Sequence, residues 1–495
     1  MKENLRKQKY DYVLMALIAL GSCFRIFVCF QHNPMDHLVS DMLRHWMNGI
    51  HFPRGGYTAA SDPILYQVYM YALERITWLN RFQVALAAAL LSVLMPVPYY
   101  LAARNFGLRK TPALWVWVLI AWTPSLVTIY HYIMMETLLL AIDGLALWMT
   151  ARYLKKGGTL GFLLSVACWT LAALTKPTVI PLAGICVLWT LWKRMPSLAA
   201  MATAVVMVIV LLLPQAIRSK VRLGFIAPFG NPWLTKIQHR AGKRGIEVYL
   251  HSPGDQGLQV SESDYKLIFV SPSCSVEPLW PFSHWMIRRA HDYSLFVVSI
   301  DSSRGAADWK ESYESLHVGS REWLAQWGEN IVTFLFAPSW PDSMMSKQEW
   351  DDWLTYVTRW MWAPLIVFIL ISNGREFLHR RFELVPVAVT LFTLFLLFQN
   401  VATAEGRYRK PLEPFLLLNL VWIFGKHAAN GAGSETGDKL ASAEKVQAQA
   451  QAPELANPTT HFSWPSGSLS FQRPLPFRLA LRRQRDVDRP FLFCT

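Results

Sequence analysis

Long apolar runs separated by short polar loops constrain this chain more than any other feature. A helix needs about 20 mostly apolar residues to cross the hydrocarbon core of a bilayer. Runs that reach or approach this length cover approximately residues 12–30, 82–103, 113–130, 134–153, 159–174, 178–192, 197–217, 354–371, 384–399 and 411–424. With 53% hydrophobic and 17% charged residues overall, they exclude an ordinary soluble domain. They predict an all-α polytopic membrane protein with about ten transmembrane helices.

The lysines and arginines predict how these helices are oriented. Basic residues concentrate in the short cytoplasmic loops of membrane proteins. The chain begins with a basic segment, and the loop after every second run is basic; these residues are Lys2, Arg6, Lys7, Lys9, Arg104, Arg109, Lys110, Arg152, Lys155, Lys156, Lys193, Arg194, Arg375, Arg380 and Arg381. Both termini are therefore expected in the cytoplasm. The net charge of +14 follows from this topology, so no nucleic-acid partner is expected.

The first outer loop, residues 31–81, decides this topology. Its second half, from Asp62-Pro63 to Arg75, is rich in tyrosine and carries Glu74 next to Arg75. An amphipathic, aromatic segment of this kind is typical of a helix lying in the membrane interface. If the segment crossed the membrane instead, every later loop would change sides and the inner loops would lose their basic character.

Two further regions are predicted to lie outside the membrane. Residues 218–353 separate an N-terminal membrane module, 1–217, from C-terminal membrane helices, 354–425. A structureless loop of that length would be unusual, so a mixed extracytoplasmic cap is expected. Residues 426–495 are rich in Ala, Gln, Ser and Gly and end in a basic stretch, which predicts a disordered cytoplasmic tail that contacts anionic membrane lipid.

The first outer loop also carries the first candidate catalytic acids, Asp36 and Asp41. Asp41 follows Ser40 at the start of a short amphipathic segment. A carboxylate here could accept a proton from an acceptor hydroxyl as a general base. Alternatively, Ser40 caps a helix and Asp41 only complements the helix dipole.

Other ionisable residues are expected at the same membrane face. Glu136 opens the fourth run and Lys176 closes the fifth, and both could instead serve as helix-end or interfacial residues. Basic side chains that could hold a phosphate follow at Arg218 and in the sequence Arg407-Tyr408-Arg409. Asp143 lies inside the fourth run, where a carboxylate is functional or hydrogen-bonded to a neighbouring helix. His131 lies close to Glu136, which leaves a divalent metal possible, although no metal ligand is assigned.

Five short motifs carry a resemblance to a known superfamily. They are the first-loop acid in Ser40-Asp41, the proline-led segment at Asp62-Pro63, Glu136 at the start of the fourth run, Pro214 to Arg218 ahead of Gly230 to Trp233, and Glu405 to Pro414. In this order, residues 1–424 resemble GT-C membrane glycosyltransferases, most closely the family with protein O-mannosyltransferases and the lipid A aminoarabinose transferase. The pattern departs from the family at Ser40, where a second acid is common, and at Ser219, where Asn is common.

The resemblance implies a function. A sugar would pass, with inversion, from a polyprenyl-phosphate donor to a glycan, lipid or protein acceptor at the extracytoplasmic face of a bacterial inner membrane. Asp41 would be the base, supported by Glu136, and Asp36 could replace the missing acid. The donor phosphate would be bound by residues of later outer loops, namely Lys176, Arg218, Arg407, Tyr408 and Arg409. No cofactor is implied with certainty.

Two other classes of protein stay open. A transporter or flippase for a lipid-linked or anionic solute would use the same charges for binding, and would show internal repeats and polar positions near mid-membrane. Asp143 is one such position, but no repeat is evident. A polysaccharide ligase or polymerase would also use a lipid-linked sugar and a large outer loop with arginines.

Overall fold

The computed structural model describes residues 2–36, 38, 40–52, 62–78, 80–231, 246–251, 296–301, 320–337, 350–398 and 406–425. Contacts separate the chain into two units, Met1–Ala432 and Gly433–Thr495. The second unit and the whole predicted tail, residues 426–495, lie outside the described residues.

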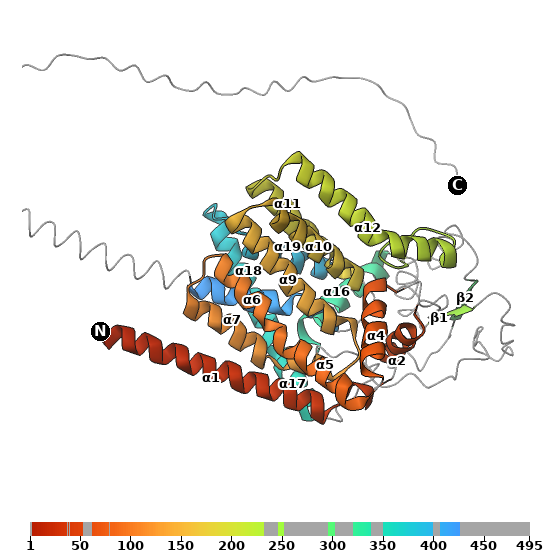
Figure 1. Ribbon diagram of the computed structural model, residues 1–495, viewed down its shortest axis with the longest axis horizontal. Coiled ribbons are helices and arrows are strands. Elements are labelled where there is room, and N and C mark those ends of the chain that lie inside the picture. Colours follow the sequence, from red (N-terminus) through yellow and green to blue (C-terminus); the bar gives the residue numbers. More distant parts are fainter. Residues whose placement is uncertain are drawn as a thin grey trace, which may run out of the picture. The chain divides into compact units, whose positions relative to one another are not determined.

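Helices dominate the described part of the first unit (Figure 1). Five of them are long and apolar enough to cross a membrane: Gln8–Asp36, Arg81–Asn105, Met135–Lys156, Leu198–Leu223 and Leu354–Leu378. A bent pair, Lys110–Trp122 with Pro124–His131, would form a sixth span, and shorter apolar helices lie at Thr159–Thr175, Pro177–Lys193, Leu384–Phe398 and Glu413–Gly425. Each predicted run therefore coincides with a helix. The all-α membrane class is confirmed, whereas the number of ten spans stays a prediction.

The labelled elements of the membrane region follow the chain in order. They are α1 (Lys2–Gln31), α5 (Arg81–Leu94), α6 (Pro96–Asn105), α7 (Lys110–Trp122), α8 (Pro124–Thr128), η2 (Ile129–His131), α9 (Met135–Lys156), α10 (Thr159–Thr175), η3 (Pro177–Val179), α11 (Ile180–Lys193), α12 (Leu198–Leu223), α18 (Trp362–Leu378) and α19 (Leu384–Phe398). Of the five long helices, the one formed by α9 is the most buried within the protein. In its most apolar stretch 56% is buried, compared with 17–39% for the others. Because α6 and α10 pack along it, α9 is the central helix of the bundle.

The third predicted run is bent rather than straight. Between α7 and α8 the axis turns by 66°, at Pro124, which has no N–H to continue the helical hydrogen bonds. The carbonyls of Ile120 and Ala121 at the end of α7 accept hydrogen bonds of 2.7 and 3.0 Å from the buried Arg25 of α1. Arg25 also donates to the Ser92 carbonyl and hydroxyl. This guanidinium therefore stabilises the bend with all of its nitrogens engaged.

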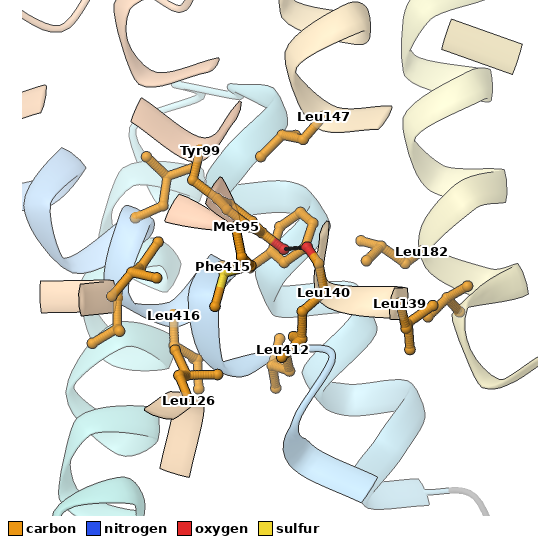
Figure 2. Close-up of a cluster of buried hydrophobic side chains, with 14 of the residues drawn as sticks. Met95, Tyr99, Leu126, Leu139, Leu140, Leu147, Leu182, Leu412, Phe415 and Leu416 are labelled. Atoms are coloured by element: carbon orange, nitrogen blue, oxygen red, sulfur yellow. Dashed lines mark hydrogen bonds between the residues drawn. The ribbon is translucent and has the colours of Figure 1, made fainter. Parts of the chain in front are cut away.

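The core lies where α6, α9 and the last helix, Glu413–Gly425, meet (Figure 2). The Tyr99 hydroxyl of α6 donates a 2.9 Å hydrogen bond to the Leu140 carbonyl of α9. The Tyr99 ring also meets Phe415 of the last helix edge to face, with centroids 5.8 Å apart. Because Leu139, Leu140 and Leu182 are fully buried around them, the start of α9 is fixed by packing on several sides.

The predicted first outer loop, residues 31–81, contributes η1 (Pro34–Asp36), α2 (Ser40–Ile50) and α4 (Ile64–Thr77). The predicted interfacial segment is thus a helix that begins after Pro63, and its 14 residues are too few to cross a bilayer. α2 and α4 pack against each other, since each has an apolar face.

The predicted cap range includes two short parallel strands, β1 (Ile246–His251) and β2 (Phe296–Asp301), and the helix α16 (Ser320–Phe336). α16 packs on α19, and its Trp327 indole donates to the Leu397 carbonyl. The chain then forms α17 (Trp350–Thr358), η4 (Arg359–Met361) and α18, so the helical segment begins earlier and ends later than the predicted run 354–371. η5 (Gly406–Arg409) precedes the last helix.

Candidate functional site

The central pair of the candidate site joins two neighbouring helices. Glu136 lies in the first turn of α9, and Lys176 directly follows the end of α10. Because these consecutive helices pack against each other and are joined by a short turn, the start of one lies beside the end of the other. Lys176 Nζ lies 2.5 Å from Glu136 Oε1, and the two side chains are only 8% and 1% exposed. An ion pair so shielded from water interacts more strongly than a surface pair.

The aromatic ring of Tyr408 also contacts Lys176. η5 places the Tyr408 ring with its centroid 5.0 Å from Lys176 Nζ, within the range of a cation–π contact. The structure thus brings together two predicted donor-binding residues that lie far apart in sequence. The side chain of Arg407, beside Tyr408, lies outside the described residues.

Arg409 is directed into a different part of the protein. Its guanidinium is fully buried and donates to Glu413 Oε1 at 3.2 Å, to the Ala337 carbonyl at 3.0 Å and to the Phe334 carbonyl. Burial lowers the pKa of this guanidinium, and Glu413 partly offsets the shift. These contacts tie η5 to α16. They favour a structural role for Arg409 over the predicted role in phosphate binding.

Arg409 belongs to a cluster that we call the Arg409 joint, formed by Arg409, Lys410, Glu413 and Ser125. Lys410 donates to the Ser125 carbonyl, and the Ser125 hydroxyl donates to Glu413 Oε2 at 2.6 Å. Ser125 belongs to α8, directly after the bend. The joint therefore connects the bend to the start of the last helix.

Asp62 forms a second polar cluster that the sequence analysis missed. Asn48 of α2 donates to Asp62 Oδ2 at 3.1 Å, and Arg44 and His45 lie 3.5 and 3.8 Å from the carboxylate. The Asp62 carbonyl accepts from Gln67. The sequence indicated only that Asp62 directly precedes Pro63 at the start of a predicted helix. An acid in that position is equally well explained as a residue that stabilises the helix start.

Arg218 joins this cluster from the end of α12. Its guanidinium donates a 2.8 Å hydrogen bond to Gln67 Oε1 and lies 5.4 Å from the centroid of the Phe52 ring. Gln215, one turn earlier, donates to the Asp62 carbonyl. The predicted donor-binding residue Arg218 therefore does reach the first outer loop, next to Asp62.

Tyr66 links the two clusters. Its ring contacts His45 edge to face at 5.4 Å between centroids, and its hydroxyl is close enough to interact with the side chains of Thr137 and Glu136. Burial, with smaller contributions from Tyr69 and Glu136, raises the pKa of the Tyr66 hydroxyl, so the hydroxyl stays protonated at neutral pH. We call Asp62, Tyr66, Glu136, Lys176, Arg218 and Tyr408 the candidate site.

A small pocket adjoins the candidate site between α4, α5 and the start of α9. It is lined by tyrosine and apolar side chains, including Tyr66, Tyr69, Tyr130, Tyr132 and Thr137. Burial raises the pKa of Tyr69 to about 12. The pocket's volume of about 20 Å³ is enough for a water molecule but not for a sugar ring.

The first-loop acids are placed differently from each other. Asp36 of η1 forms an exposed ion pair with Arg81 at the start of α5. Asp41 lies in the first turn of α2, and its side chain is outside the described residues. His131 is buried against Tyr132 and 5.4 Å from the His32 ring, between centroids. Within the described ranges, no group of three or more His, Cys, Asp or Glu side chains is arranged to hold a metal ion.

The fold and the clusters define an all-α membrane protein in which the segment that contains α2 and α4 meets α9, α10 and α12 at a cluster of carboxylates and cations. No family model, curated protein or solved structure matches the chain.

Proposed function

We propose that the protein is a GT-C-type membrane glycosyltransferase that moves a sugar from a polyprenyl-phosphate donor to an acceptor hydroxyl. One observation carries the proposal: the Glu136–Lys176 pair of α9 and α10, with Tyr408 of η5 against Lys176, is linked through Tyr66 to the Asp62 cluster, which Arg218 of α12 joins. Lys176 and Arg218 supply positive charge for a phosphate, and neither is held by backbone carbonyls in the contacts described above.

The chemistry is a single displacement. The acceptor oxygen attacks the anomeric carbon while the bond from that carbon to the phosphate oxygen breaks, and the configuration inverts. The acceptor proton passes to a carboxylate, for which we propose Asp41, on the helix that packs against α4. Lys176 and Arg218 stabilise the departing polyprenyl phosphate. Glu136 holds Lys176 in position through their 2.5 Å contact.

The proposed setting is a bacterial inner membrane, with both termini in the cytoplasm and the site on the extracytoplasmic side. The basic loops that alternate with the helices support this orientation.

The test uses the purified full chain in lipid, radiolabelled polyprenyl-phosphate sugars and a membrane extract as the source of acceptors. Transfer and donor binding are measured for the wild type, for Asp41→Asn and for the control Glu376→Gln, which neutralises an ion-paired carboxylate on α18. We expect Asp41→Asn to lose transfer but to keep donor binding, and the control to behave like the wild type. Transfer by Asp41→Asn at the wild-type rate would refute the assignment of the base.

A transporter or flippase is the second candidate, and Asp143 is the observation that favours it. This carboxylate is fully buried within a membrane-spanning helix, a position common in transport pathways. If the wild type binds the lipid-linked sugar but transfers it to no acceptor, and moves it across a vesicle membrane, the transport function replaces the enzymatic one.

A further inference from the structure

Asp143 is a carboxyl group that the proposed sugar transfer does not use. It lies in α9, seven residues after Glu136 and therefore about 10.5 Å further along the helix axis. Its side chain is fully buried, and neither carboxylate oxygen has a hydrogen-bond partner among the described residues. Leu139, Leu140 and Leu147, one turn away on the same side of α9, belong to the apolar core (Figure 2).

Among the residues that the structure describes, no cation pairs with Asp143. Tyr99 of α6 and Cys186 of α11 are close enough to interact electrostatically with its carboxylate. The remaining titratable or charged side chains on the elements packed against α9 are Tyr100 and Arg104 on α6, Arg81 on α5, Cys168 on α10, Lys193 on α11, Tyr130 and His131 on η2, and Glu413 on the last helix. None of these has an interaction with Asp143 among the contacts described.

We propose that Asp143 is a proton-binding site in the membrane-spanning core, occupied as the neutral carboxylic acid. An ionised carboxylate without a partner is far too costly in an apolar interior, and binding a proton is the simplest way to remove its charge. A hard metal cation needs several oxygen ligands, whereas Tyr99 and Cys186 add one hydroxyl and one thiol. The Tyr99 hydroxyl already donates its proton to Leu140. This inference does not depend on the sugar-transfer proposal.

A membrane-soluble carbodiimide tests the proposal, because it reacts with protonated carboxyl groups in apolar surroundings. The carboxyl proton moves to a carbodiimide nitrogen while the carboxyl oxygen bonds to the central carbon, and the adduct rearranges to a stable acylurea with nothing released. The full chain in lipid vesicles is treated at acidic, neutral and alkaline pH, and modified peptides are identified by mass spectrometry. We expect modification of Asp143 at acidic and neutral pH that falls as the pH becomes alkaline.

Glu136, on the same helix, is the internal control, because its pairing with Lys176 keeps it ionised and unreactive. Asp143→Asn should lose the label, and it should also lose the infrared band of a protonated carboxyl group that the wild type shows in the same vesicles. The band reports protonation even where the reagent cannot enter. Absence of that band at every pH would overturn the proposal. Protection of Asp143 from the reagent by Na⁺ at constant pH would also overturn it, by identifying a cation site instead.

Discussion

The Arg409 joint and the candidate site each bury a carboxylate against a cation, but they use their charges differently. In the joint, the Arg409 guanidinium bonds to Glu413 and to two backbone carbonyls. In the candidate site, the contacts of Lys176 are the carboxylate of Glu136 and the face of Tyr408. The first arrangement ties fixed backbone segments together, whereas the second is made of side chains that can change partner.

This difference separates structural from functional charges inside a membrane protein. Arg25 follows the pattern of the joint, since its nitrogens bond to the backbone at the bend and to Ser92. An ammonium group has three N–H donors, so Lys176 can retain Glu136 while it donates to an incoming phosphate. We therefore expect charge removal in the candidate site to affect activity, and charge removal in the joint to affect stability.

The largest effect is expected for Glu136→Gln. Loss of the carboxylate frees Lys176 from its position, and sugar transfer should fall by about 10²-fold or more, the range typical of losing one group that stabilises charge in the transition state. Transfer is measured under single-turnover conditions with saturating donor. The double variant Glu136→Gln/Lys176→Met controls for stability, because it removes both charges of the buried pair. Wild-type transfer in the single variant, or recovery in the double variant, would contradict the proposed role of the pair.

Arg409→Met should lower the free energy of unfolding by about 3–5 kcal/mol, because it leaves the buried Glu413 without its cation. Thermal unfolding in detergent, followed by tryptophan fluorescence, measures the loss. Adding Glu413→Gln should restore part of the stability. Transfer per folded molecule should stay unchanged in both variants. If folded Arg409→Met protein fails to bind the donor, Arg409 belongs among the phosphate ligands as the sequence suggested.

The contrast between Arg409 and Lys176 also shows how far sequence reasoning reaches. The apolar runs and the basic loops predicted the membrane class and the positions of the helices, because these depend on local composition. Glu136 and Lys176 were identified because both flank predicted helices at one face. The partners of Arg409 were not predictable, since Phe334 and Ala337 accept through backbone carbonyls that carry no sequence signal.

Two other features were missed for related reasons. In the sequence, Arg25 is a single charged residue within an apolar run. Its role is to bond to the carbonyls at the bend before Pro124, and this bend forms only in the folded bundle. Asp62 was read as the start of a helix, and only the folded chain brings α2 and the end of α12 to it. The sequence allowed the segments themselves to be predicted, but not which distant segments contact each other.

Variants of Arg218 test the part of the candidate site that lies around Asp62. Arg218→Gln should weaken binding of the polyprenyl-phosphate donor by about 10-fold or more, because a hydrogen bond to a charged group contributes roughly 1.5–3 kcal/mol. Arg218→Lys should recover only part of the binding, because it keeps the charge without the planar guanidinium. Arg222→Gln, one turn further along α12 and exposed, is the matched control. Equal binding by all three variants would remove Arg218 from the site.

The smallest effect is expected for Asp36→Asn. Asp36 and Arg81 are 37% and 64% exposed, so water and salt screen their attraction, and such pairs contribute about 0–1 kcal/mol to stability. The variant should unfold at nearly the wild-type temperature and should transfer sugar at nearly the wild-type rate. High salt should remove any remaining difference in stability, because it weakens the pair in the wild type. A folded Asp36→Asn protein without transfer would show that an exposed pair can also be functional. The candidate site would then extend to η1, and burial of the ion pair would no longer separate the two kinds of charge.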